Sequence, residues 1–276
     1  MTENQDHRKR SPEGAFLALT VWLLALGTVT YGLRSWFPPL ASEHGVGVDR
    51  MMHYLMVASG FLFLTGHLVL GYVVWRFSRQ GAVTVRILAP RLERRWSIIL
   101  AVIMTLVAEG GVLVLGLPVW NRFHSKPPAD AVTVEVTGEQ FGWNVHYAGV
   151  DGMFGRSSPQ MISLDNPVGI DRKDAAAKDD VLLLGTMYLP VNRPAHIRLR
   201  SKDVLHSFFL PNFRVKQDAV PGMTIDFWFV PTKPGTYEIA CAELCGFAHY
   251  NMRGVLYVIS ESEFEQWLKS EAPFFS

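Results

Sequence analysis

The stretch CAELCGFAHYNM at residues 241–252 decides the fold, and it contains both cysteines of the 276-residue chain. Its thiolate, imidazole and thioether groups are soft ligands, which suit copper better than calcium or magnesium. The segments on either side, 236–240 and 255–259, are rich in β-branched and aromatic residues, so we expect each to be a strand. The stretch is therefore predicted to be a metal-binding loop between two strands, with enough thiolate to bridge two ions.

Three interpretations of this loop are open from the residue types alone. Two cysteines four positions apart in an exported domain could form a small disulfide. Cys241, Cys245 and His249, together with the upstream His206, would instead complete a Cys2His2 tetrahedron for zinc. A Cys2His2 zinc site is complete without the thioether of Met252, whereas copper accepts a thioether ligand. The residue types therefore favour copper, and zinc stays open as the main alternative.

The loop motif C-x-E-x-C-x3-H-x2-M, with the upstream sequence DVLHS, resembles the dinuclear copper (CuA) centre of cytochrome c oxidase subunit II. In that family two thiolates bridge two copper ions, each of two histidines caps one ion, and a methionine is a weak axial ligand. The resemblance implies that six positions bind the metal pair: the side chains of His206, Cys241, Cys245, His249 and Met252, and the backbone carbonyl of Glu243.

The charged residues are divided unevenly along the chain. Residues 1–116 contain 11 Lys and Arg against 7 Asp and Glu, and the remainder contains 15 against 18, so the formal total is +1. The mildly acidic second half fits a basic protein partner. Nothing in the chain resembles the clustered basic face of a nucleic-acid-binding protein, so we expect no nucleic-acid partner.

Three apolar stretches, residues 15–33, 52–75 and 97–116, are each long enough to cross about 30 Å of hydrocarbon. They predict N-terminal transmembrane α-helices and a lipid bilayer as partner. The first stretch follows a polar segment, 1–14, which we expect in the cytoplasm, and it could be the apolar part of a secretory signal. Its length and the lack of a clear small-x-small cleavage site favour a retained helix.

The loop between the second and third stretches, residues 76–96, contains six arginines and one acid, Glu93. The positive-inside rule places this loop in the cytoplasm, so the third stretch leads outward. Subunit II of the oxidases usually has two membrane helices, and the second and third stretches resemble that pair. The sequence LERRW resembles the entry to the family's second helix, which implies for Glu93 a place at the mouth of a proton path. A salt bridge to its arginine neighbours is the alternative role.

From residue 131 the hydrophobic period changes to two, which indicates strands separated by Gly, Pro and Asp turns. With the two strands around the metal loop, this pattern predicts an all-β Greek-key sandwich over residues 128–260. The family resemblance implies that this sandwich is cupredoxin-like. The other strands are expected at 133–137, 144–147, 181–184, 196–200 and 225–229.

The segment 154–180 is expected to be a long surface excursion between strands. Residues 261–276 are expected to form a short helix and a tail, because SESE at 260–263 is a capping box. His206 is expected to end a strand, whereas His146 and His196 are interpreted as structural or surface residues. A set of aromatic residues is expected to exclude water from the metal: Phe208, Phe209, Phe213 and Phe247.

Two further stretches resemble the family. In GEQFGW, Phe141 stands where the family usually has the tryptophan through which electrons enter, and Trp143 matches a retained position. The resemblance implies that both take part in electron entry, although aromatic residues in a strand are otherwise core residues. Phenylalanine lacks the indole N–H, which leaves the docking geometry of the donor open. In RVKQDAVPG, the resemblance implies that Lys216 and Asp218 contact subunit I.

The function that the resemblance implies is that of subunit II of a haem-copper cytochrome c oxidase. The chain would take single electrons from a c-type cytochrome and pass them to haem in subunit I, where oxygen is reduced. It would lie in a bacterial inner membrane beside the other oxidase subunits, with the copper domain on the periplasmic side. Two other functions stay open: a membrane-anchored copper carrier or assembly protein, and an ectodomain stapled by zinc.

Overall fold

The structure is a computed structural model that describes residues 11–34, 36–78 and 90–275. Parts of the expected polar segment 1–14 and arginine loop 76–96 lie outside these described residues. The chain divides into two compact units. One comprises Met1–Trp36 and Arg50–Leu117, and the other comprises Phe37–Asp49 and Pro118–Ser276.

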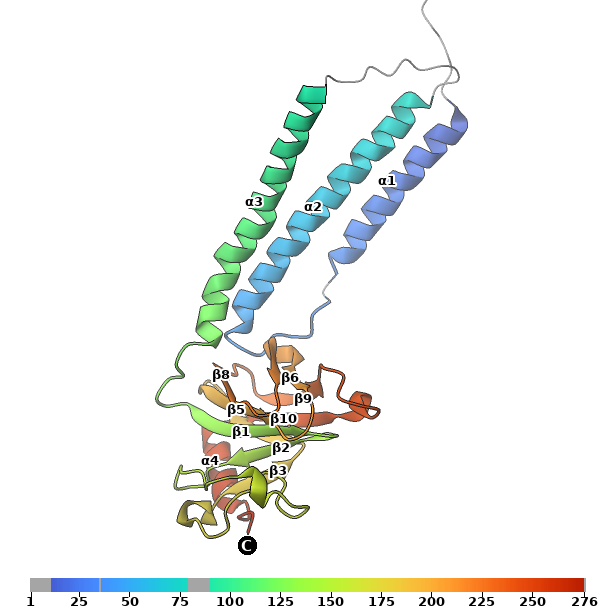
Figure 1. The fold of residues 1–276 in the computed structure, drawn as a ribbon. Helices are drawn as coiled ribbons and strands as arrows, with labels where there is room; N and C mark the ends of the chain where they lie inside the picture. Colours follow the sequence, from blue (N-terminus) through green and yellow to red (C-terminus); the bar gives the residue numbers. More distant parts are fainter. Residues whose placement is uncertain (1–10, 35, 79–89, 276) are drawn as a thin grey trace, which may run out of the picture. The chain divides into compact units, whose positions relative to one another are not determined.

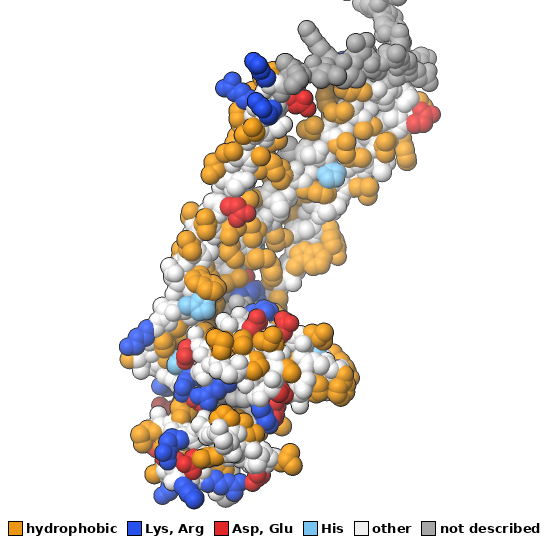
Figure 2. Space-filling view, viewed as in Figure 1, with side chains coloured by type: hydrophobic (Ala, Val, Ile, Leu, Met, Phe, Trp, Pro, Cys, Tyr) orange, Lys and Arg blue, Asp and Glu red, His pale blue; other side chains and the backbone are white. Residues whose placement is uncertain are grey.

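In the part of the chain that the structure describes, three helices are long and apolar enough to cross a membrane: α1 (Pro12–Gly32), α2 (Gly45–Phe77) and α3 (Pro90–Phe123). Apolar side chains cover them, and most of these side chains are exposed to the surroundings of the chain (Figure 2). Such a surface is costly in water and costs nothing in lipid. The chain is therefore a membrane protein.

Among the described residues of the N-terminal unit, polar contacts join its helices. The indole N–H of Trp22 in α1 donates to the Leu68 carbonyl in α2 over 3.2 Å, and Gly71 makes room for this indole. The hydroxyl of Tyr54 in α2 donates to the Val107 carbonyl in α3. Because lipid offers no hydrogen-bond partner, such contacts help to hold apolar helices together.

The second unit contains two five-stranded sheets (Figure 1). The first has the order β3-β2-β1-β5-β8, and the second has the order β4-β10-β9-β6-β7. Each sheet has one parallel pair, β1 with β5 and β10 with β4, among antiparallel ones. The strands of the first sheet are β1 (Val132–Glu139), β2 (Gly142–Tyr147), β3 (Val181–Leu184), β5 (Ala195–Ser201) and β8 (Ile225–Phe229). Those of the second are β4 (Thr186–Pro190), β6 (His206–Leu210), β7 (Val215–Ala219), β9 (Gly235–Cys241) and β10 (Arg253–Ile259).

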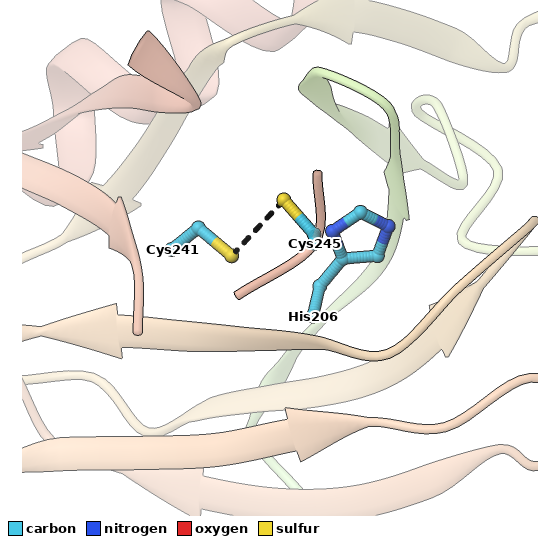
Figure 3. Close-up of side chains that lie close together, drawn as sticks. All are labelled: His206, Cys241 and Cys245. Atoms are coloured by element: carbon cyan, nitrogen blue, oxygen red, sulfur yellow. Dashed lines mark hydrogen bonds between the residues drawn. The ribbon is translucent and has the colours of Figure 1, made fainter. Parts of the chain in front are cut away.

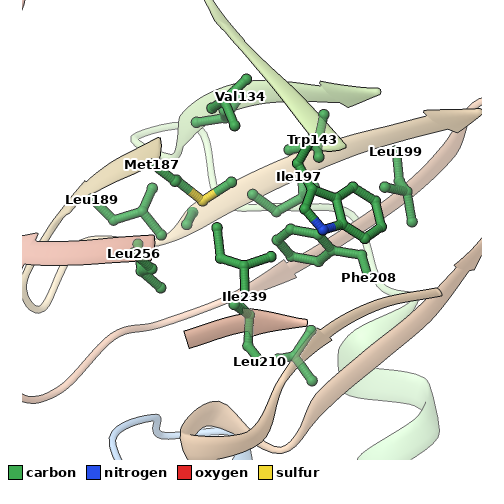
Figure 4. Close-up of a cluster of buried hydrophobic side chains, with 14 of the residues drawn as sticks. Val134, Trp143, Met187, Leu189, Ile197, Leu199, Phe208, Leu210, Ile239 and Leu256 are labelled. Atoms are coloured by element: carbon green, nitrogen blue, oxygen red, sulfur yellow. The ribbon is translucent and has the colours of Figure 1, made fainter. Parts of the chain in front are cut away.

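The apolar core lies between the two sheets (Figure 4). In β5 the side chains of Ala195, Ile197 and Leu199 are fully buried and alternate with more exposed ones, as the period of two predicts. The other sheet contributes large apolar side chains from all its inner strands. Labelled in Figure 4 from that sheet are Met187, Leu189, Phe208, Leu210, Ile239 and Leu256.

All seven strands expected from the sequence are confirmed, but β4, β6 and β7 were missed. The run around β3 and β4 reads as one apolar stretch, yet Gly185 adopts a φ of 68° and the chain passes there from one sheet to the other. The expectation that His206 ends a strand was wrong, because it begins β6. Between β6 and β7 the chain turns at Arg214, which has a φ of 57°.

The segment 154–180 is confirmed as a long excursion between β2 and β3. It contains two short 3-10 helices, η1 (Pro159–Met161) and η2 (Ala175–Lys178). It also buries an apolar side chain, Ile170, beneath it. The expected C-terminal helix is confirmed as α4 (Glu261–Ser270), with the capping box at Ser260 formed.

Candidate metal centre

Strand pairing explains how residues far apart in sequence meet at one end of the second sheet. The metal loop leaves β9 at Cys241 and returns to β10 at Arg253. Strand β6 pairs with β9 in a register that sets Phe208 opposite Cys241. His206, two positions before Phe208, therefore lies beside the start of the loop although it precedes Cys241 by 35 positions.

The ligand atoms of His206, Cys241 and Cys245 lie within 4.8 Å of one another, and the three side chains point toward one another (Figure 3). The two sulfur atoms are 3.9 Å apart and both cysteines are free. Cys245 Sγ is also 3.6 Å from Nδ1 of His249 and 3.6 Å from Sδ of Met252. The loop thus supplies two further donors around the pair of thiols, and β6 supplies the third.

The sixth expected ligand is a backbone group. The carbonyl oxygen of Glu243 lies 3.2 Å from Cys241 Sγ, while the Glu243 side chain is exposed. This orientation leaves the carbonyl, and not the carboxylate, facing the thiols. All six expected ligand positions therefore meet in one place.

The unsatisfied polar atoms of the cluster fit a soft metal ion. His206 is fully buried, and its Nδ1 has no hydrogen-bond partner, although buried polar atoms are nearly always paired. Burial, and next the neighbouring Cys241, raise the pKa of the Cys245 thiol to about 11. A metal ion would displace that proton and take the free imidazole nitrogen as a ligand. Two sulfurs and an imidazole are a donor set for copper or zinc.

Asp203 is a contact of the site that the sequence analysis did not single out. Its Oδ1 accepts a hydrogen bond from His206 Nε2 over 2.8 Å. Burial would raise the pKa of Asp203, but hydrogen bonds from His206 and from the backbone N–H groups of Gln140 and Val204 lower it. The signal was available in the sequence, because an aspartate three positions before a ligand histidine is close enough to orient its ring.

The four aromatic residues expected to exclude water differ in burial, and the ring of Phe213 packs on Phe229 and Tyr237. Phe208 and Phe213 are fully buried, whereas Phe247 is 90% exposed. The expectation that Phe247 excludes water was therefore wrong. It follows Gly246, whose φ of 143° turns the loop outward. Phe209 is half-buried.

The two residues expected at the electron entry have different surroundings. Trp143 is fully buried, and its ring packs edge-on against those of His206 at 6.0 Å and Phe208 at 5.3 Å. Phe141 is half-buried in the turn between β1 and β2, and its ring meets that of Phe247 at 5.1 Å. A docked protein can reach Phe141 and cannot touch Trp143.

The remaining expected residues lie outside the cluster. Lys216 and Asp218 lie on β7, one of the two edge strands of the second sheet, and their side chains pair at 3.0 Å. Asp218 also accepts a hydrogen bond from Ser207, the residue after His206, over 2.7 Å. Glu93 lies in the first turn of α3, in the other unit of the chain, with its side chain exposed.

Comparisons with known proteins agree on one family. The family model described as cytochrome c oxidase subunit II, periplasmic domain, matches residues 132–259. The alternative cytochrome c oxidase subunit 2 of Bradyrhizobium diazoefficiens is 37% identical over 261 residues, which cover 94% of this chain and 92% of that protein. The cytochrome c oxidase subunit 2 of Cereibacter sphaeroides is 33% identical over 248 residues, which cover 84% of this chain and 78% of that protein.

Among solved structures, the periplasmic domain of subunit II of cytochrome oxidase from Bradyrhizobium japonicum is similar to this chain at 29% identity. The match covers 53% of this chain and 96% of the solved domain, with a TM-score of 0.39. The predicted fold class, N-terminal membrane helices followed by an all-β cupredoxin-like sandwich, is confirmed. The extent and identity of the match to full-length relatives decide the assignment: the chain belongs to the cytochrome c oxidase subunit II family.

Proposed function

We propose that this chain accepts single electrons from a c-type cytochrome at a dinuclear copper centre and passes them to haem in subunit I. The observation that carries the proposal is that four further donors meet around two free thiols, and one of them is a buried imidazole nitrogen that lacks a hydrogen-bond partner. A carrier that must release its metal has no need for so complete a ligand set. Copper is favoured over zinc because a thioether sulfur lies 3.6 Å from Cys245 Sγ.

Each donor has a role in holding the metal pair. The thiolates of Cys241 and Cys245 and the imidazoles of His206 and His249 would hold the two copper ions. Met252 and the Glu243 carbonyl would complete the coordination. When bound, the pair supplies a one-electron redox centre whose charge is spread over both ions and both sulfurs.

The protein buries part of this site and holds its ligands in place. His206, Cys245 and Met252 are all less than 5% exposed, so water has little access to these three, whereas Cys241 and His249 are half-buried. Backbone hydrogen bonds hold the loop to the sheet: Ala242 N–H donates to the Ser207 carbonyl over 2.9 Å, and Cys241 N–H donates to the Met252 carbonyl over 3.2 Å. Ligands that are held in this way move little when the charge changes, which favours fast electron transfer.

The partners and the location follow from the same proposal. The donor docks outside the membrane, where Phe141 is accessible, and the haem lies in subunit I of the same complex. Other oxidase subunits and a bacterial inner membrane surround the helices, with the copper domain on the periplasmic side. In this assembly Lys216 and Asp218 contact subunit I, and Glu93 lies at a proton path. Oxygen is reduced in subunit I.

Rapid mixing of the purified oxidase with a reduced c-type cytochrome tests the proposal. We expect the cytochrome to be oxidised in a fast phase that is lost when the copper is removed with a chelator and returns when copper is restored. An identical fast phase in the copper-depleted oxidase would contradict it. Metal analysis of the same sample separates the alternatives, because one labile copper per chain supports a carrier and stoichiometric zinc supports a structural staple.

A further inference from the structure

The imidazole of His206 is hydrogen-bonded to a carboxylate. Its Nε2 lies 2.8 Å from Oδ1 of Asp203, and its side chain is fully buried. An ionised carboxylate only accepts hydrogen bonds, so the proton of the neutral ring stays on Nε2. The lone pair is then on Nδ1, the atom that has no hydrogen-bond partner. One contact thus decides which nitrogen is available on the buried ring.

Asp203 is itself fixed on both of its oxygens. Its Oδ2 accepts the backbone N–H of Gln140 over 2.7 Å, and its Oδ1 also accepts the N–H of Val204 over 2.7 Å. The side-chain amide of Gln140 in turn donates to the carbonyl of Cys245 over 2.5 Å. The carboxylate is therefore tied to the β1–β2 turn, and that turn is tied to the metal loop.

The other side of the ring is equally confined. A Cβ atom at Gly138 would stand 3.0 Å from Cδ2 of His206, so a larger residue there would press on the ring. Trp143 packs against the ring edge-on. With the ring plane confined and Nε2 tethered, Nδ1 has a single direction available, which is toward the thiols.

We propose that Asp203 is a positioning residue that fixes the tautomer and the orientation of His206 as a metal ligand. This inference rests on the proposed function of the site. A carboxylate behind an imidazole makes the ring a stronger electron donor to a metal, so Asp203 also stabilises the oxidised form of the centre. Removing it lowers copper retention and raises the reduction potential.

The test compares three variants of the full chain in the assembled oxidase. Asp203→Ala removes the tether, and Asp203→Asn keeps a carbonyl oxygen that accepts from Nε2. Glu139→Gln is the matched control, because Glu139 pairs with Lys202 close by and its side chain is 23% exposed against 31% for Asp203. It removes an equal charge without touching His206. Copper retention against a chelator, the EPR spectrum and the midpoint potential are measured for each.

We expect Asp203→Ala to retain copper about 10- to 100-fold more weakly, which is the usual effect of removing the partner of a metal-bound histidine. In Asp203→Ala the reduction potential rises and the EPR hyperfine pattern changes. Asp203→Asn recovers most of the copper retention, and Glu139→Gln behaves as the parent. The proposal is overturned if Asp203→Ala matches the parent in all three readouts, or if Glu139→Gln shifts them as much.

A metal-free measurement separates this proposal from the function of the site. In the full chain with ¹⁵N-labelled histidine and no metal, we expect the NMR signals of His206 to show the Nε2–H tautomer, and Asp203→Ala to lose this preference. A parent chain that binds no copper pair but keeps the tautomer would refute the function and leave the positioning role standing. An Nδ1–H tautomer in the parent would overturn the positioning role whatever metal is bound.

Discussion

Two buried histidines in the β domain have different hydrogen bonds. His206 and His146 are 0% and 1% exposed, and each lies within 2.9 Å of an aspartate oxygen, on Asp203 and Asp180 respectively. The second nitrogen of His146 meets Glu135 at 3.3 Å, whereas that of His206 meets nothing. Both nitrogens of His146 are therefore paired, whereas His206 keeps one nitrogen free, as its proposed role as a metal ligand requires.

The surroundings of His146 show what the fully paired arrangement does. Asp180 also accepts the backbone N–H of Gly155 over 2.9 Å, and Glu135 pairs with Arg198 at 2.5 Å. The cluster therefore fastens the segment 154–180 to the first sheet. Burial opposes a charge on His146, but the hydrogen bonds that His146 donates to Asp180 and Glu135 prevail and raise its pKa. We interpret charged His146, paired with Asp180 and Glu135, as a charged clamp.

The largest effect is expected at the thiols. Cys245→Ser replaces one of the two sulfurs that can bridge a metal pair, so we expect the chain to lose that pair and its EPR signal. The fold should remain, because Ser is close in size to Cys and the core between the sheets is not altered. Copper analysis and near-ultraviolet circular dichroism of the purified oxidase measure the two properties separately. A variant that still held two coppers with an unchanged spectrum would show that Cys245 is not a ligand.

The clamp should give the opposite pattern. His146→Leu leaves two carboxylates buried without their cation, which costs about 3–5 kcal/mol of folding stability. Copper content and spectrum should stay as in the parent, because none of the metal-loop residues touches this ring. Chemical unfolding of the metal-free full chain in detergent gives the stability. Loss of copper with unchanged stability would reverse the roles we assign to the two histidines.

The charge on the clamp also predicts a pH dependence. Because folding raises the pKa of His146, its contribution is complete below the pKa of an unfolded histidine, about 6.5, and is lost as the pH rises through the folded value. The groups around the ring are Asp180 and Glu135, with Arg198 and Arg200 paired to Glu135. We expect the melting temperature of the metal-free parent chain to fall as the pH rises. The melting temperature of His146→Leu should fall less over the same pH range. Equal slopes for the two proteins would refute a charged clamp.

The smallest effect is expected from a methyl group at the edge of the metal loop. Gly246 has a φ of 143°, and a Cβ there would stand 2.8 Å from Gln140 Nε2 and 3.0 Å from the Phe141 ring. Gly246→Ala should cost about 1–2 kcal/mol through backbone strain and should also slow electron uptake from the cytochrome. Gly152→Ala is the matched control, because Gly152 has a φ of 73° but open space around it. Equal electron uptake in the two variants would show that the contact with Phe141 is unimportant.

The sequence predicted well which donor groups of the loop lie together, because they are close in the chain and lie between two strongly patterned strands. It did not reveal that His206 begins β6, because the register of β6 against β9 depends on packing between distant segments. The clamp was hidden for the same reason, since His146 and Asp180 are 34 positions apart. Asp203 was overlooked although its spacing from His206 is local. Gly185 made two strands look like one, because the apolar pattern continues through a change of sheet.

Counting copper ions and unpaired spins in the same oxidised sample tests the central claim most directly. We expect two coppers per chain with one unpaired electron shared between them, giving an EPR hyperfine pattern from two equivalent copper nuclei. Subunit II must be separated from subunit I for the count, or the copper of the partner subtracted. One spin on a single copper nucleus, or a chain whose sulfurs are joined in a disulfide with no copper bound, would contradict the account.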